Sequence, residues 1–254
     1  MKNLEYNINN NIGLLKLSRV EKHNAFNTEI LTELTELLDA EKNNKNLRLL
    51  IITGAGEKSF SSGVDLSALI NFKDIEDAHD FAILLESTSE KIFNFPKPTI
   101  AAINGFALGG GFGYASACDY RIMADTAKIG FPAIKLGAIL PVTCTAYLNA
   151  LIGVGKARDL LLTGRIVESP EAEKIGLVNK VVSRELLMEK TYEIANQILE
   201  GNDTAIFYTK RTINNLLLKD IEMQKMYAAD NFAYLSQTKE WQKRMHDFNN
   251  KKKK

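Results

Sequence analysis

Apolar residues in the first part of the chain form short continuous runs separated by longer stretches with helical spacing. Two strand-like runs, Leu4 to Asn9 and Ile12 to Leu17, flank an Asn-Asn pair. Because asparagine tolerates the positive φ angles of a tight turn, this pair predicts an opening β-hairpin. Two further runs, Leu47 to Thr53 and Thr99 to Ile103, are mainly apolar. Strands that are buried on both faces have this composition.

Helical periodicity fills the intervals between these strands. The apolar residues from Ile30 to Leu38 follow Asn27 and Thr28, either of which could cap a helix, and predict a helix that ends near Asn43. Leu69 to Asn94 has the same spacing and ends before two prolines. Beyond Pro141 the pattern predicts an almost wholly helical chain. The candidate helices there are Val142 to Leu151, Gly155 to Thr163, Pro170 to Ile175, Ser183 to Leu199, Asp203 to Leu217, and Asp220 to Phe248 with a break near Ser236.

Strands that alternate with helices predict an α/β fold in which helices cover the sheet. A further strand is expected at Tyr120 to Ala124, and the stretch Lys128 to Leu140 is broken by Pro132 and Gly137. No repeat, long linker or low-complexity tract divides the 254 residues. We therefore expect an α/β core over residues 1–190 and a helical C-terminal extension over residues 191–254.

The composition of the chain bears on whether it binds nucleic acid or membranes. The chain has 32 Lys and Arg against 31 Asp and Glu, so no strong positive field favours nucleic acid or an anionic membrane. Its one basic run, Lys251 to Lys254, is expected to be a solvated tail. No membrane-spanning run or signal peptide is recognisable. Cys118 and Cys144 fit neither a disulfide framework nor a metal site, so we expect a cytoplasmic protein without a metal.

Two glycine-bearing turns follow two of the predicted strands. Ser61 to Gly63 comes after Leu47 to Thr53, and Gly109 to Gly111 comes after Thr99 to Ile103. If the strands are neighbours, both turns reach the same edge of the sheet, where open α/β folds bind ligands. Glycines at a helix start leave the first backbone amides accessible, and two amides aimed at one carbonyl form an oxyanion hole. The alternative is that the glycines only let the helix pack closely on its strand.

Several motifs, taken in their order and spacing, resemble the crotonase superfamily, which includes the enoyl-CoA hydratases and isomerases. The resemblance covers nearly the whole chain. Phe60 to Leu66 reads Phe-Ser-Ser-Gly-Val-Asp-Leu and is similar to the family's Phe-x-Ala-Gly-Ala-Asp-Leu. The other matching segments are Arg19 to Asn27, Lys97 to Asp119, Gly164 with Arg165, Ala172 to Val178, and Lys210.

The resemblance implies a spiral of repeated β-β-α turns whose C-terminal helices assemble trimers, commonly stacked in pairs as hexamers. It also implies an acyl-CoA substrate, so that coenzyme A enters as part of the thioester and no cofactor is tightly bound. The amides of Ser62 and Gly110 are then the expected oxyanion donors. The residues expected to bind the substrate are Lys22, Ala25, Gly63, Val64, Asp65, Leu66, Gly109 and Lys210. Asp65 could instead cap the next helix, or do both.

Three positions depart from the patterns of relatives. Gly113 and Ala133 stand where the family's hydratases carry catalytic glutamates, and Pro141 stands where its aromatic dehalogenases carry an aspartate. Hydration needs one group to activate the water and another to deliver a proton at Cα. We therefore expect an acyl-CoA enzyme of the hydratase/isomerase family that is not an efficient hydratase. Isomerisation, decarboxylation and thioester hydrolysis stay open, as does a catalytically silent CoA-binding or scaffold protein.

Other side chains could supply the proton chemistry, although a surface or packing role is the stronger expectation for each. They are His79, Asp80, Glu86 and Glu90 on the helix predicted before the glycine strand, and Tyr114, Thr143, Cys144 and Thr145 near the glycine turn. Lys135 lies between two apolar residues and is expected in solvent.

Overall fold

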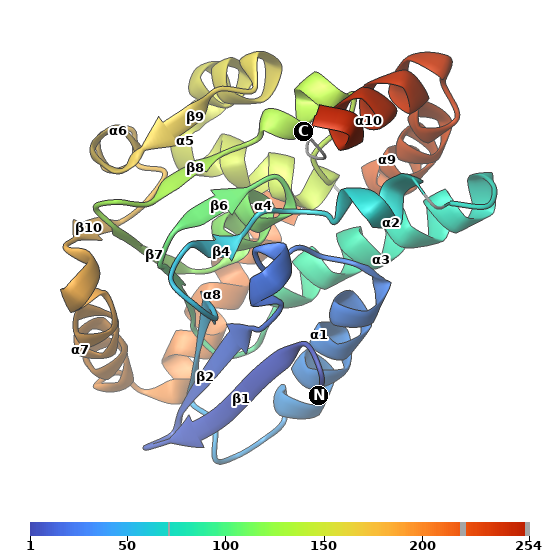
Figure 1. The fold of residues 1–254 in the computed structure, drawn as a ribbon. Coiled ribbons are helices and arrows are strands. Elements are labelled where there is room, and N and C mark those ends of the chain that lie inside the picture. The colour runs from blue at the N-terminus through green and yellow to red at the C-terminus, as the bar shows by residue number, and fades with distance from the viewer. Residues whose placement is uncertain (71, 219–221, 252–254) are drawn as a thin grey trace.

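Six strands form the main sheet of the protein, whose computed structural model describes residues 1–70, 72–218 and 222–251 (Figure 1). They lie in the order β1 (Leu4–Asn9), β2 (Ile12–Leu17), β3 (Leu49–Gly54), β5 (Thr99–Ile103), β7 (Tyr120–Ala124) and β10 (Lys180–Val182). β1 and β2 form an antiparallel hairpin, and the other neighbouring strands are parallel. All residues of β3 and β5 are buried, as expected for parallel strands covered on both faces.

A second sheet is built from strands of three residues each. Its order is β4 (Ser59–Ser61), β6 (Phe106–Leu108), β8 (Lys128–Gly130) and β9 (Ile166–Glu168). β4, β6 and β8 each follow a strand of the main sheet and precede a helical segment. These segments are α2 (Leu66–Ile70), α4 (Gly110–Ala117) and the short 3-10 helix Pro132–Leu136. This repeated strand-strand-helix turn confirms the predicted α/β spiral.

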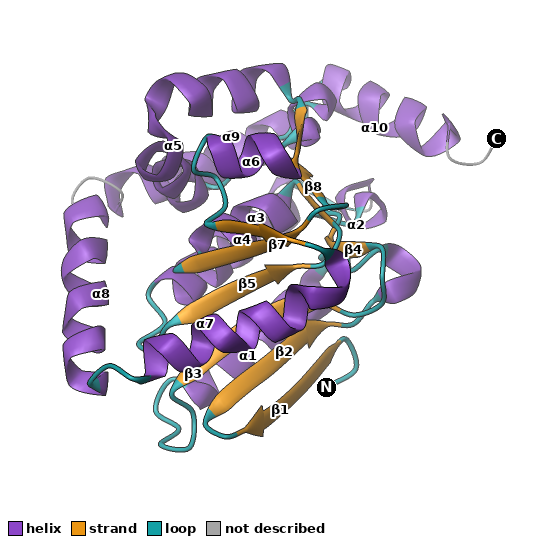
Figure 2. Cartoon of the chain, turned by 90° about the vertical axis from the view of Figure 1, so that its left-hand side faces the viewer, coloured by secondary structure: helices purple, strands orange, loops and turns teal. Residues whose placement is uncertain are grey.

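Helices cover both sides of the main sheet. Figure 2 shows α7 (Leu187–Leu199) lying across one face, where it contacts β3, β5 and β7. α1 (Thr28–Glu41), α3 (Ile75–Phe93) and α4 pack together on the other side. α5 (Val142–Thr163) and α9 (Glu222–Ser236) also contact α3, while α10 (Lys239–Lys251) contacts α2. The remaining helices are α6 (Ser169–Lys174) and α8 (Asp203–Leu218).

The strands and helices predicted for the first half are confirmed with small shifts at some ends, except for the single helix predicted over Leu69 to Asn94. The structure has the end of α2 and a separate α3 there, and residues 72–74 are not helical. The opening hairpin and the strand Thr99–Ile103 have the predicted bounds. Asn27 caps α1, since its Oδ1 accepts a hydrogen bond from the Ile30 amide at 3.1 Å. α5 joins the two helices predicted on either side of Gly153, whose φ of 76° interrupts the helical geometry. The start of the helix predicted from Asp220 lies outside the described residues.

The C-terminal half is less helical than the pattern predicts. β9 and β10 both lie beyond Pro141, in the stretch predicted to be almost wholly helical, because three-residue strands are too short to show a period. The predicted division after residue 190 falls inside α7, and it stays a prediction. Of the expected lysine tail, Lys251 ends α10 and the other three lysines lie outside the described residues. Among the described helices, none is long and apolar enough to cross a bilayer.

Candidate functional site

A cleft of about 870 Å³ opens where the turn after β4 meets the turn after β6. All but two of the predicted site residues line it. Those that do are Lys22, Ala25, Ser62, Val64, Asp65, Leu66, Gly109 and Gly110. The two glycine turns, which are far apart in the sequence, therefore share one cavity, as the neighbouring strands β3 and β5 require.

Gly63 holds the two turns in contact. Its φ is 92°, a value that favours glycine, and an added Cβ would lie 2.9 Å from the Gly110 nitrogen and 2.7 Å from the Leu108 oxygen. Both distances are shorter than a real Cβ contact tolerates. A larger residue at this position would therefore push the turns apart. Gly63 supports the cleft from behind and is not among its lining residues.

The amide of Ser62 does not point at the cleft as a donor, and this corrects the prediction. It donates to the His23 oxygen at 3.0 Å. Two residues on, Val64 forms a parallel bridge with Phe26, in which Phe26 donates to the Gly63 oxygen and Asp65 donates to the Phe26 oxygen, both at 2.7 Å. In such a bridge the backbone donors alternate in direction, so the Val64 N–H points away from Phe26.

Val64 and Gly110, one on each glycine turn, are therefore cleft residues with available amides. Gly110 is the first residue of α4, and the first amides of a helix have no intrahelical partner. Within the described ranges neither amide has a hydrogen-bond partner, and both residues line the cleft. The sequence could not show which amide of this loop is available, because the direction of an amide depends on the distant Phe26 bridge.

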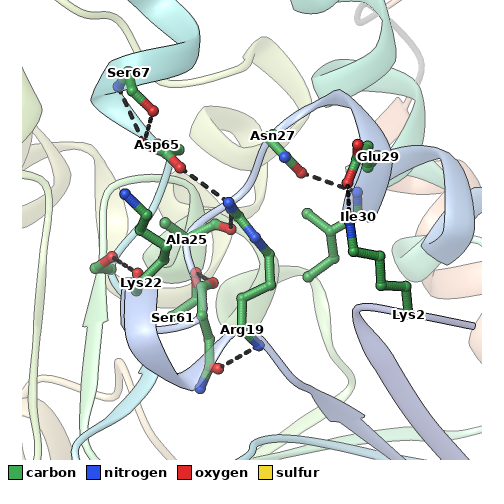
Figure 3. A network of polar contacts seen from close by, with 12 residues as sticks. Lys2, Arg19, Lys22, Ala25, Asn27, Glu29, Ile30, Ser61, Asp65 and Ser67 are labelled. Atoms are coloured by element: carbon green, nitrogen blue, oxygen red, sulfur yellow. Dashed lines mark hydrogen bonds and ion pairs between the residues drawn. The ribbon is translucent and has the colours of Figure 1, made fainter.

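Arg19 and Asp65 fasten this loop (Figure 3). Arg19 Nη1 donates to the Ala25 oxygen at 2.5 Å, and Nη2 lies 3.1 Å from Asp65 Oδ2. The other oxygen of Asp65 accepts hydrogen bonds from the Ser67 amide at 3.1 Å and the Ser67 hydroxyl at 2.7 Å. Burial disfavours the charged carboxylate, but these hydrogen bonds and Arg19 outweigh it and lower the pKa of Asp65. Asp65 thus caps α2, the alternative that the sequence left open.

Charged groups gather at the mouth of the cleft. Glu21, Lys22 and His23 come from the segment after β2, and Lys135 comes from the opposite wall. Lys135 is exposed, as predicted, but it also borders the opening. In the described part of the chain, Lys22 and Lys135 have no ion-pair partner, so both ammonium groups can meet an anionic ligand.

Much of the cleft wall is apolar. The residues of this apolar wall are Leu69, Leu85, Leu108, Phe131, Pro132, Ala133, Leu136, Ala138, Ile139, Pro141, Phe232, Met245 and Phe248. The last three come from α9 and α10, so the C-terminal helices close their own chain's cleft. Gly113 lies behind this wall, and an added Cβ there would lie 2.8 Å from Cys144 Sγ. None of these residues carries a carboxylate.

Several other side chains that were considered for proton transfer make contacts outside the cleft. His79 Nε2 lies 3.3 Å from Asp230 Oδ1 and ties α3 to α9 outside the cleft lining. The Tyr114 hydroxyl donates to the Leu85 oxygen at 3.0 Å. Burial raises the pKa of Tyr114 and of the Cys144 thiol, so neither ionises near neutral pH. These residues stabilise the fold, as the sequence analysis expected.

Lys210 does not line the cleft within this chain, and its contact with the substrate stays a prediction. Its Nζ donates to Asp119 Oδ2 at 2.6 Å and to the Lys97 oxygen at 3.1 Å. Asp119 also accepts a hydrogen bond from the Thr99 amide at 2.7 Å. This ion pair therefore lies at the amino ends of β5 and β7, whereas the cleft lies beyond their carboxyl ends. No group of His, Cys, Asp or Glu among the described residues could hold a metal.

Comparisons with known proteins agree with this arrangement. The family model described as enoyl-CoA hydratase/isomerase matches residues 7–254. A crotonyl-CoA hydratase of Syntrophomonas wolfei is 37% identical over 242 residues, which cover 95% of this chain and 93% of that relative. A short-chain-enoyl-CoA hydratase of Clostridium acetobutylicum is 35% identical over 242 residues, which cover 95% of this chain and 92% of that relative. The crystal structure of an enoyl-CoA hydratase from Bacillus anthracis has a TM-score of 0.81 at 34% identity. The match covers 98% of this chain and 96% of that structure's chain.

Proposed function

Because the chain belongs to the enoyl-CoA hydratase/isomerase family of the crotonase superfamily, we propose that it stabilises the enolate of an acyl-CoA thioester between the amides of Val64 and Gly110. The observation that carries the proposal is the pair of unpartnered amides, within the described residues, on one cleft. As a proton leaves Cα, negative charge develops on the thioester oxygen. Two fixed donors lower that barrier, and the loss of one donor typically costs about 2.7 to 4 kcal/mol.

The rest of the cleft suits the two ends of such a substrate. Lys22 and Lys135 at the mouth can pair with the phosphates of coenzyme A. Ala25 and Leu66 offer small and apolar surface along the cleft, and the apolar wall offers its surface to the acyl chain. Coenzyme A is in this proposal part of the substrate, and no tightly bound cofactor is required.

We also expect a trimer or a pair of stacked trimers. The support within this chain is the apolar surface of α8, where Tyr208, Ile213 and Leu216 are 58%, 54% and 77% exposed. Apolar side chains grouped on one helix commonly mark a subunit contact. Sedimentation of a monomer at micromolar concentration would contradict this expectation.

The cleft supports the binding of an acyl-CoA more specifically than it supports any one reaction. Gly113 and Ala133 offer no carboxylate, so we propose that hydration is slow and that isomerisation, decarboxylation or thioester hydrolysis is the main activity. The apolar wall also favours a second candidate, a catalytically silent protein that binds acyl-CoA. Turnover of crotonyl-CoA and of a 3-enoyl-CoA, with affinity measured by calorimetry, separates the two.

Gly110→Pro is the sharpest test, because it removes the amide hydrogen and proline is tolerated at the first position of a helix. We expect kcat/KM to fall about 100- to 1000-fold. Gly110→Ala is the matched control, since it adds a Cβ 3.0 Å from the Phe26 ring and keeps the amide hydrogen. Equal losses in the two variants would refute the oxyanion assignment, and an absence of acyl-CoA binding in the unmodified protein would refute the whole proposal.

A further inference from the structure

Glu86 is a buried carboxylate that the proposed oxyanion hole does not use. It lies on α3 and is only 7% exposed. Its Oε2 accepts a hydrogen bond from the Val142 amide at 2.9 Å, and its Oε1 accepts one from the Thr143 amide at 3.0 Å and another from the Thr143 hydroxyl. Donors at the start of α5 therefore hold both oxygens of this carboxylate in place.

A small cavity beside Glu86 shares part of its wall with the large cleft. Its volume is about 20 Å³. A buried water needs roughly 10 to 15 Å³ and polar partners, and Glu86 is the polar side chain in the described lining of this cavity. Glu86 lines this cavity. Four residues line both the cavity and the large cleft: Leu85, Ile139, Pro141 and Phe232. The small cavity therefore adjoins the cleft next to Glu86.

The same region lies in front of the Cβ direction of Gly113. A Cβ at Gly113 would lie 2.8 Å from Cys144 Sγ and 3.3 Å from Leu140 Cδ1. Leu140 lines the small cavity, and Cys144 directly follows the Thr143 that binds Glu86. A carboxylate from α3 therefore lies next to the place that a side chain on α4 would have to enter. No carboxylate belongs to the apolar wall of the cleft itself.

We propose that Glu86 is the proton acceptor of this enzyme and that it acts through one water in the small cavity. The water takes a proton from the acyl Cα and passes one of its own protons to the Glu86 carboxylate. The electron pair of the broken C–H bond forms the enolate, whose oxygen charge is held by the Val64 and Gly110 amides. The reverse transfer returns a proton to the carbon skeleton, so no other reactant is consumed. This inference rests on the proposed oxyanion hole.

Exchange of the Cα protons of butyryl-CoA in D₂O, followed by proton NMR, tests this step without assuming the overall reaction. Glu86→Gln keeps an acceptor oxygen for one of the two α5 amides, turns an NH2 group toward the other, and is a far weaker base. We expect it to slow exchange at least ~100-fold, within the usual range for acid-base groups, and to abolish the acid limb of the pH profile. Glu86→Asp should recover part of the rate.

Two further variants separate the proton role from a role in folding. Ser89→Ala removes a 2.7 Å contact with the Thr143 hydroxyl and leaves the carboxylate in place, so exchange should stay within a few-fold of the unmodified protein. Ala229→Val fills the small cavity and should slow exchange more than ~10-fold, with unchanged affinity for butyryl-CoA. This second variant decides the matter if Glu86→Gln does not fold.

Exchange in a folded Glu86→Gln at the unmodified rate would overturn the inference, as would full exchange in Ala229→Val. The absence of exchange in unmodified protein saturated with butyryl-CoA would overturn it too, because an acceptor beside an enolate site must exchange Cα protons. None of these results alone tests the two amides. Failure of the oxyanion hole appears separately, as equal activity in Gly110→Pro and Gly110→Ala.

Discussion

Replacement of Asp65 by asparagine isolates the charge that fastens the Val64 loop. Asparagine can still accept the Ser67 hydrogen bonds and is itself a good helix cap, so α2 should keep its start. What is lost is the negative charge 3.1 Å from Arg19 Nη2. The guanidinium would keep its contact with the Ala25 oxygen and would lack its counter-ion.

The size of the loss follows from burial. Both side chains are only 11% exposed. An exposed ion pair contributes about 0 to 1 kcal/mol, whereas removal of one partner of a buried pair costs about 3 to 5 kcal/mol. Because the Arg19–Asp65 pair is mostly buried, we expect Asp65→Asn to reduce the free energy of unfolding by about 3 kcal/mol, the lower end of that range.

Urea unfolding of four proteins measures the pair: the unmodified chain, Asp65→Asn, Arg19→Met and the double variant. Since the second substitution removes a charge already left unpaired, the double variant should cost less than the sum of the singles by at least ~1 kcal/mol. Turnover should fall with Asp65→Asn, because the Val64 amide adjoins the loosened residue. A single-variant loss below ~1 kcal/mol, or strict additivity, would refute the claim that the pair behaves as buried.

Two further predictions concern packing and pH. Gly113→Ala places a Cβ 2.8 Å from Cys144 Sγ. The overpacking should cost about 1 to 3 kcal/mol, more than the gain of ~1 kcal/mol or less in helix propensity, so the variant should be less stable. Cys144→Ala in the same chain should restore stability, and calorimetry that finds Gly113→Ala more stable than the unmodified protein would contradict this prediction. The pKa of Asp65 is lowered in the fold, so its stabilisation is present above its unfolded pKa of about 3.9 and is lost as the pH falls through the folded value. Melting temperatures between pH 7 and pH 2 should therefore fall less steeply for Asp65→Asn, and parallel curves would exclude the effect.

Local patterns were enough to predict the elements that depend on local forces. The Asn-Asn pair between β1 and β2 has positive φ angles of 48° and 64°, as the hairpin required. β5 is a five-residue run of buried side chains between a proline and an asparagine, and its bounds were predicted without error. The glycine turns also lie on one cleft, because parallel neighbouring strands carry them to the same edge.

Features that depend on contacts between distant residues could not be predicted from the sequence. β9 is a three-residue strand that forms only by pairing with β8, and no period is visible over three residues. The oxyanion donor was assigned to Ser62 because its loop was recognised, but the choice between neighbouring amides is made by Phe26, which bridges Val64. The ion pair of Lys210 with Asp119, at the opposite ends of the strands, was likewise not predicted.

Glu86 shows why proton chemistry is difficult to find by periodicity. α3 is enclosed by α1, α4, α5 and α9, so residues on more than one of its sides are buried. Thr88 faces α1 through a 3.0 Å contact with Thr35, and Ser89 faces α5 through Thr143. In an amphipathic surface helix such polar positions would be solvent-facing, which is why a surface or packing role was the stronger expectation for Glu86. In an enclosed helix they must instead find partners inside, and the partner of Glu86, the start of α5, lies beside the acyl cleft.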